Sequence, residues 1–257
     1  MRFSKWHALG NSYLLIEQAD LGRPLAADQV RLLCDLRYGI GSDGVLEVLN
    51  VDDGVAEIAI WNPDGSLTEF SGNGTRIAAM WLSHRTGAEA VVVAVDGRRY
   101  AARRLEDGRI EMDVGAVEIG ETITLELAEE RVELTPAAVG NPHAVVRRRE
   151  SQRTDLLRLG PLIESHERFP GRTNVQLVRV DDLHAVTALV WERGAGETSA
   201  SGSSAVAVAG AAVVNGWCES PVTVRMPGGE LEVSLDSENR ATLTGPAEQI
   251  CTGETTL

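Results

Sequence analysis

The sequence has few cysteines, few aromatic residues and no excess of basic residues. Its three cysteines, Cys34, Cys218 and Cys251, lack the paired spacing of a zinc site or a redox pair. We therefore expect no metal site. Unpaired thiols are typical of a reducing compartment, so we expect a cytoplasmic protein. Aromatic residues make up 4% of the chain, and no basic residues interleave with the tryptophans, which argues against a platform for stacking nucleic-acid bases.

Positive charge is scarce as well. The chain has 24 lysines and arginines against 38 aspartates and glutamates, for a formal net charge of -14. Such a negative field repels nucleic-acid phosphates and anionic membrane surfaces. No apolar run is long enough to cross a bilayer, and the N-terminus lacks the pattern of a secretory signal. We therefore expect neither nucleic acid nor a membrane as a partner.

Periodic segments are present throughout. The 257 residues, 43% of them hydrophobic, suffice for one large domain or two lobes. Residues 91–95 form a short apolar run, and residues 110–114, 122–127 and 231–235 alternate apolar with polar residues, as half-buried antiparallel strands do. Residues 28–38 predict a helix that stops at Gly39, and further helices are expected after Gly74 and Gly202. The pattern predicts an α/β (α+β) fold.

One segment occurs twice. Residues 71–79 (SGNGTRIAA) resemble residues 201–209 (SGSSAVAVA), and the two copies lie 201 − 71 = 130 positions apart, about half the chain. Each copy is a Ser-Gly turn that opens an apolar helix. A duplicated lobe explains the spacing, although Ser-Gly is also a common helix cap, so the repeat alone leaves both interpretations open.

A Ser-Gly turn at a helix start suits the binding of an anion. Its backbone N–H groups and the positive end of the helix dipole favour a carboxylate or a phosphate. Two such turns, each with a serine, would also suit a racemase, which removes a proton from one face of a carbon and supplies one to the other. The run GIGSDG at residues 39–44 follows a helix rather than a strand, so we expect no dinucleotide, and no lysine has the context of a pyridoxal phosphate site.

The ordered set of motifs resembles the diaminopimelate epimerase family almost from end to end. The motifs are KWHALGN at 5–11, RYGIGSDG at 37–44, NPDGS at 62–66, SGNGTR at 71–76, GNPH at 140–143, TNV at 173–175, WERGAGET at 191–198 and SGSS at 201–204. The resemblance implies two pseudo-symmetric lobes, each a mixed, mostly antiparallel sheet around a central helix. Their expected bounds are residues 1–116 with 246–257, and residues 117–245, with the active site in the cleft between them.

The resemblance also implies the chemistry. Members of the family interconvert LL- and meso-diaminopimelate for lysine and peptidoglycan synthesis, need no cofactor and often form homodimers. The two proton-transfer positions are Ser71 and Ser201, with His143 and Glu192 beside them. Positions that match the family's substrate-binding residues are Asn11, Asn62, Gly72, Asn73, Asn141, Asn174, Glu192, Arg193, Gly202 and Ser203.

Serine occupies both positions where the family carries cysteine. A thiol has a pKa of about 8.5, and an aliphatic hydroxyl is a far weaker acid, so a serine needs a strong neighbouring base. Either His143 and Glu192 assist the serines, or the chain is a catalytically silent relative that binds diaminopimelate or another amino acid, or both cysteines were replaced to inactivate it. Gly44, where some members have a larger polar residue, leaves room for a racemase of a different amino acid.

Overall fold

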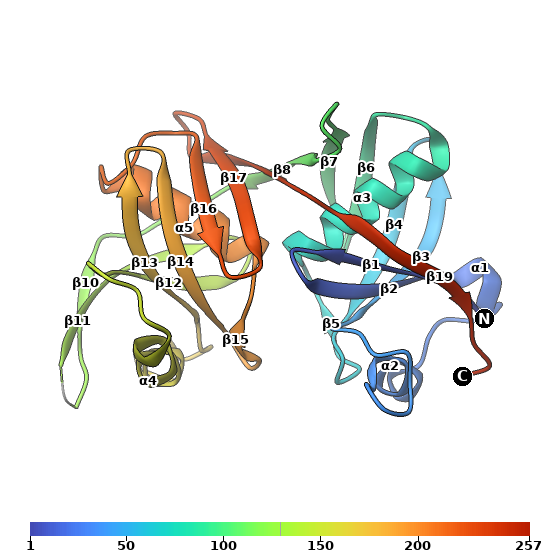
Figure 1. The fold of residues 1–257 in the computed structure, drawn as a ribbon, viewed down its shortest axis with the longest axis horizontal. Helices are drawn as coiled ribbons and strands as arrows, with labels where there is room; N and C mark the ends of the chain where they lie inside the picture. Colours follow the sequence, from blue (N-terminus) through green and yellow to red (C-terminus); the bar gives the residue numbers. More distant parts are fainter. Residues whose placement is uncertain (129) are drawn as a thin grey trace. The chain divides into compact units, whose positions relative to one another are not determined.

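The computed structural model describes residues 1–128 and 130–257. The chain divides into two compact units, residues 1–112 with 245–257 and residues 113–244. Figure 1 colours them from blue to green with the red C-terminal strand, and from green to orange. Among the helices that the structure describes, none is long and apolar enough to span a membrane.

The first unit is a mixed sheet around one central helix. Its strands run in the order β19-β1-β2-β3-β4-β6-β7-β8, with β5 added to β4; β2 with β3 and β4 with β6 are parallel pairs, and the other neighbours are antiparallel. The elements are β1 (Arg2–Ala8), β2 (Asn11–Glu17), α1 (Gln18–Leu21), α2 (Ala27–Cys34), β3 (Val45–Asp52), β4 (Val55–Trp61), β5 (Leu67–Thr68), α3 (Gly72–Thr86), β6 (Ala90–Val95), β7 (Arg98–Arg104), β8 (Ile110–Ala116) and β19 (Glu248–Glu254).

The second unit repeats this arrangement. Its strands run β10-β11-β12-β13-β14-β16-β17-β18, with β9 added to β11 and β15 to β14, and β12 with β13 and β14 with β16 are the parallel pairs. The elements are β9 (Glu118–Ile119), β10 (Ile123–Glu126), β11 (Arg131–Ala138), β12 (Pro142–Arg147), α4 (Arg153–Glu164), β13 (Asn174–Asp182), β14 (Ala185–Glu192), β15 (Gly196–Thr198), α5 (Gly202–Val214), β16 (Val222–Met226), β17 (Gly229–Leu235) and β18 (Arg240–Gly245).

The strand register shows that the two units are copies of one design. In the first unit Leu14 of β2 lies opposite Val45 of β3, and in the second Ala144 of β12 lies opposite Val175 of β13. Both members of the pair are shifted by 130 positions, the same offset that separates Ser71 from Ser201. The predicted pair of pseudo-symmetric lobes, each a mixed sheet around a central helix, is therefore confirmed.

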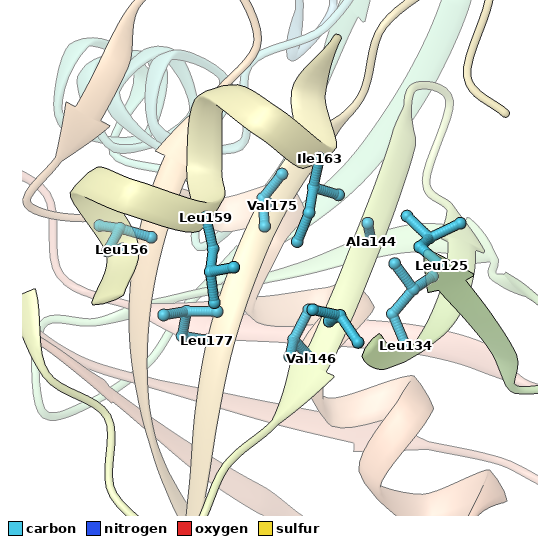
Figure 2. Packing of buried hydrophobic residues seen from close by; sticks show 10 residues of the cluster. Leu125, Leu134, Ala144, Val146, Leu156, Leu159, Ile163, Val175 and Leu177 are labelled. Carbon is cyan, nitrogen blue, oxygen red and sulfur yellow. The ribbon is translucent and has the colours of Figure 1, made fainter. Parts of the chain in front are cut away.

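Each sheet separates two layers of side chains. In the second unit Ala144, Val146, Val175 and Leu177 pack against the buried face of α4, as Figure 2 shows. Because successive residues of a strand point to opposite faces, the residues between them face the central helix α5. The alternation thus places His143 and Gln176 beside the helix that Ser201 opens.

The first unit follows the same rule. Leu14, Ile16 and Val45 pack with the apolar face of α2. Tyr13, one position before Leu14, therefore lies on the opposite face of β2, toward the central helix α3. Both central helices are buried over most of their length, which fixes the position of their first turns.

The strands predicted at residues 91–95, 110–114, 122–127 and 231–235 are confirmed as β6, β8, β10 and β17. The helix predicted over residues 28–38 is too long, because α2 ends at Cys34. The carboxylate of Asp35 accepts the backbone N–H groups of Arg37 and Tyr38, both at 2.7 Å. This local turn replaces further helix, since an aspartate side chain competes for backbone N–H groups.

Candidate active site

Ser71 and Ser201 are the N-caps of the two central helices. Ser71 Oγ accepts the N–H of Gly74 at 3.1 Å, and Ser201 Oγ accepts the N–H of Ser204 at 3.5 Å. Both serines have extended backbones, with φ of -138° and -143°. Both predicted helices are thus confirmed, beginning at Gly72 rather than after Gly74 and at Gly202 rather than after it, and the two hydroxyls occupy equivalent positions.

The two helix starts are suited to an anion. The N–H groups in the first turn of a helix have no carbonyl partner within the helix, and the helix dipole adds partial positive charge there. Neither α3 nor α5 has an acidic residue in its first turn. No side-chain carboxylate of these turns therefore competes with an external carboxylate at Gly72 and Asn73, or at Gly202 and Ser203.

The first serine has a phenol beside it. The hydroxyl of Tyr13 lies 3.1 Å from Ser71 Oγ, within hydrogen-bond distance, and either oxygen can act as the donor. Tyr13 comes from β2 and is only 7% exposed. Burial on the sheet holds the ring in this position.

A fully buried arginine orients Asn73 and Asn11 of the first unit. Arg76 donates from Nη2 to Asn73 Oδ1 at 2.9 Å and from Nη1 to the Gly72 carbonyl at 3.1 Å. Since Asn73 Oδ1 is an acceptor, its Nδ2 donates to Asn11 Oδ1, at 3.2 Å. Burial lowers the pKa of Arg76 to about 10, so the guanidinium is still charged at neutral pH.

In the second unit, His143 occupies the position equivalent to Tyr13 of the first unit, but its ring forms hydrogen bonds to other residues. Gln176 Nε2 donates to His143 Nδ1 at 3.0 Å and also to Ser204 Oγ at 3.0 Å. An amide nitrogen only donates, so the proton of the neutral imidazole is on Nε2, which donates to Asn141 Oδ1 at 2.8 Å. Burial, helped by the charge of Arg193, lowers the pKa of His143 to about 3. His143 is therefore a neutral imidazole with both nitrogens engaged.

The turn after β14 is held by two buried polar side chains. Asn174 donates to the Pro142 carbonyl at 2.8 Å and accepts the N–H of Arg193 at 3.0 Å. Glu164 accepts from Trp191 Nε1 at 2.7 Å and from the Gly194 N–H at 2.8 Å. These contacts fix the backbone of Arg193 and Gly194 and the side chain of Trp191.

Asn62 occupies the equivalent turn of the first unit, after β4. Its Nδ2 donates to Ser66 Oγ at 3.0 Å, inside the same turn. Within the units, the structure thus gathers Asn11, Gly72 and Asn73 at Ser71, pairs Asn141 with His143, and pairs Asn174 with Arg193. Among the residues that the structure describes, no hydrogen bond joins Asn62 to Ser71 or His143 to Ser201.

The cysteines lie elsewhere. Cys34 is packed with the α2 side of the first sheet, where burial raises its pKa to about 11. Cys218 is buried near the Asp182 carbonyl, and Cys251 is exposed on β19. No thiol is therefore placed at either helix start. Across residues 1–128 and 130–257, no three histidine, cysteine, aspartate or glutamate side chains gather as a metal site requires.

Three residues of this region were absent from the sequence prediction: Tyr13, Arg76 and Gln176. A signal for one of them was present, because the 130-residue offset aligns GNSY at 10–13 with GNPH at 140–143 and so pairs Tyr13 with His143. The partners of Arg76 and Gln176 depend on which face of the helix or strand is buried.

Known proteins resemble the chain over nearly its full length. The sequence profile named "Diaminopimelate epimerase" matches residues 3–120 and 136–250. A diaminopimelate epimerase from Magnetococcus marinus is 35% identical over 268 residues, covering 98% of this chain and 96% of that protein. One from Synechocystis is 35% identical over 274 residues, covering 99% and 98%. In fold alone, the chain resembles a hydroxyproline epimerase from Agrobacterium vitis with a TM-score of 0.75 at 16% identity, covering 98% and 91% of the two chains.

Proposed function

Because this chain belongs to the diaminopimelate epimerase family, we propose that it interconverts LL- and meso-diaminopimelate without a cofactor, in the synthesis of lysine and peptidoglycan precursors. Family membership makes the chain an isomerase with a small amino acid as its substrate. The proposal extends to the serines, which take the two positions of proton transfer.

One observation carries this proposal: the same serine-capped helix start occurs twice, at a fixed offset. We propose that Ser71 and Ser201 act on the same α-carbon, one taking the proton and the other returning it, with His143 and Glu192 beside the second. Negative charge develops on the α-carboxylate as the proton leaves, and helix N-termini stabilise such charge. The N–H groups proposed to hold this carboxylate are those of Gly72, Asn73, Gly202 and Ser203.

The orientation of two asparagines supports a substrate with several carboxylate oxygens. Asn11 Oδ1 accepts from Asn73, and Asn141 Oδ1 accepts from His143. Each oxygen thus has a donor from its own unit, and each amide can present its Nδ2 N–H groups to an acceptor on the substrate. We propose that Asn11 and Asn141 bind carboxylate oxygens, and that Asn62, Asn174, Glu192 and Arg193 form or support the site for the distal amino-acid end.

A specific observation favours a second candidate function, a protein that binds the amino acid without turning it over. Both acid/base positions are hydroxyls, and His143, with a pKa lowered to about 3, is too weak a base to activate Ser201 at neutral pH. Binding needs only the helix starts and asparagines, which serine leaves intact.

The two candidate functions differ in whether meso-diaminopimelate is formed. We would incubate the protein with LL-diaminopimelate and resolve the stereoisomers by chiral chromatography, with the Ser71→Ala/Ser201→Ala double variant as the matched control. Formation of the meso isomer that the control abolishes supports the epimerase. If calorimetry detects binding of LL-diaminopimelate but no meso product forms, the epimerase proposal is wrong and the binding function takes its place.

We further propose that the protein works in the cytoplasm, as a homodimer. Its thiols are unpaired, as expected in a reducing compartment. Light scattering on the purified protein gives its mass directly, for comparison with the 27.6 kDa of one chain.

A further inference from the structure

We propose that the phenol of Tyr13 is the proton-relay partner of Ser71, so that a serine and a tyrosine together replace one thiol in the first unit. This inference rests on the proposed function and names how one of its two serines becomes competent. It concerns Tyr13, which acts through Ser71 rather than on the substrate.

The hydrogen bonds around Ser71 allow its hydroxyl proton to point toward the Tyr13 oxygen. The Gly74 N–H donates to Ser71 Oγ at 3.1 Å, which fixes the oxygen at the helix start. The Ser71 hydroxyl has one proton, and the Tyr13 oxygen lies 3.1 Å away to receive it or to supply another. Ser71 is half-buried, whereas Tyr13 is 7% exposed, so the serine is the more accessible of the two.

Gly44 makes room for the tyrosine ring. A Cβ at residue 44 would lie 2.5 Å from the Trp61 carbonyl oxygen, 2.6 Å from Tyr13 Cε1 and 3.0 Å from Tyr13 Cδ1, closer than such atoms pack. The equivalent residue of the second unit is Asn174, at the same offset of 130. The Trp61 carbonyl and the Tyr13 ring therefore both leave room only for glycine at position 44.

The second unit shows that this pairing is not a general property of the fold. His143 holds the position equivalent to Tyr13, but its nitrogens bond to Asn141 and Gln176. In the first unit the ring hydroxyl bonds directly to the serine. Both units thus place a polar ring beside the helix start, and only that of Tyr13 is hydrogen-bonded to the serine of its unit.

The chemistry favours a phenol in this role. A phenol has an ordinary pKa of about 10, far below that of an aliphatic alcohol, so it holds negative charge at much lower free-energy cost. When this unit acts as the base, Ser71 Oγ takes the α-proton while its own proton passes to the Tyr13 phenolate. The electron pair of the broken C–H bond stays on the α-carbon and its carboxylate. When the unit acts as the acid, Ser71 gives its proton to the carbanion and regains one from the neutral phenol.

A double-mutant cycle separates this role from a structural one. Tyr13→Phe is made in the natural chain and in Ser71→Cys, where a thiol ionises without a phenol. We expect Tyr13→Phe to lower kcat roughly 100-fold in the natural chain, with KM little changed. The change in kcat at alkaline pH that titration of the phenol produces should also be lost. In the Ser71→Cys background the same change should lower kcat by less than about threefold.

Tyr100→Phe is the matched control, because Tyr100 is also 7% exposed in the same unit and stacks on Phe70. It should keep the kcat of the natural chain. Equal losses from Tyr13→Phe in both backgrounds would mean a packing role and overturn the inference, as would no loss in the natural chain. In either case meso product from the natural chain would leave the proposed function standing.

A second measurement applies even if the natural chain forms no product, which would sink the proposed function. With tyrosine labelled at Cζ with carbon-13, NMR follows the titration of the Tyr13 phenol in the natural chain and in Ser71→Ala. The inference requires that removing the Ser71 hydroxyl moves this titration. An unchanged titration would show that the two groups exchange no proton and would overturn the inference.

Discussion

The buried guanidinium of Arg76 donates to Asn73 Oδ1 at 2.9 Å, and this bond sets the direction of the whole Asn73–Asn11 amide chain. In the described part of the chain no carboxylate pairs with Arg76. A charge buried without a counter-ion is unfavourable for stability. We therefore predict that Arg76 contributes to the binding of an anion at the start of α3.

Replacement of Arg76 should separate stability from binding. For Arg76→Met we expect the free energy of unfolding to change by less than about 2 kcal/mol, because removal of the buried charge offsets the lost hydrogen bonds. The Kd for diaminopimelate should rise by about tenfold or more, since Asn73 and Asn11 lose their orientation. Urea unfolding and calorimetry measure the two quantities, with Arg104→Met as the control for loss of an arginine in the same unit. Unchanged affinity would contradict the role given to Arg76.

His143 should make the fold sensitive to acid. Its pKa is lowered to about 3 in the folded chain against 6.5 for the ordinary side chain, so the unfolded chain binds more protons between these values. Stability from this residue is therefore complete above pH 6.5 and is lost as the pH falls, by about 1.4 kcal/mol per pH unit. Between pH 7 and pH 5, the natural chain should lose roughly 2 kcal/mol more than His143→Gln does in urea unfolding. Parallel losses in the two proteins would show that His143 is not held neutral.

Glu164 should affect substrate binding rather than the chemical step. Its carboxylate holds the Trp191 ring and the Gly194 N–H and pairs with Arg172 at 2.8 Å, so Glu164→Gln loosens the turn that carries Arg193. We expect KM to rise roughly tenfold, at a cost of about 1–2 kcal/mol, with kcat within about twofold. Glu167→Gln, an exposed change just beyond the same helix, is the control. A fall in kcat at constant KM would place Glu164 in the chemistry instead.

The two serines should respond differently to replacement by cysteine. A thiol at a helix N-terminus has a lowered pKa and suits both proton-transfer roles. Ser201→Cys should raise kcat more than Ser71→Cys, because Ser71 already bonds to a phenol while the hydroxyl of Ser201 accepts the Ser204 N–H. Steady-state kinetics on both single variants measure this order. The reverse order would show that Ser201, not Ser71, has the better natural partner.

Much of the architecture could be predicted from the sequence, because the Ser-Gly repeat and the alternating strands are local patterns with fixed physical meaning. The Tyr13–Ser71 contact could not be, since it joins positions 58 residues apart and depends on the space left by Gly44. The neutral state of His143 was equally hidden, because it follows from complete burial and from the amide of Gln176. The end of α2 was mispredicted because the Asp35 side chain overrode the apolar periodicity.

Proton exchange tests the central claim, that two hydroxyl-bearing positions invert one carbon, most directly. The protein is incubated with LL-diaminopimelate in heavy water, and the recovered substrate and the product are analysed by NMR early in the reaction. Two-base transfer predicts deuterium at the inverted α-carbon of the meso product while the remaining LL substrate is still unlabelled, because the proton removed and the one supplied come from different groups. Equal early labelling of substrate and product would indicate one base acting on both faces, and no labelling of either, despite binding, would contradict the enzyme itself.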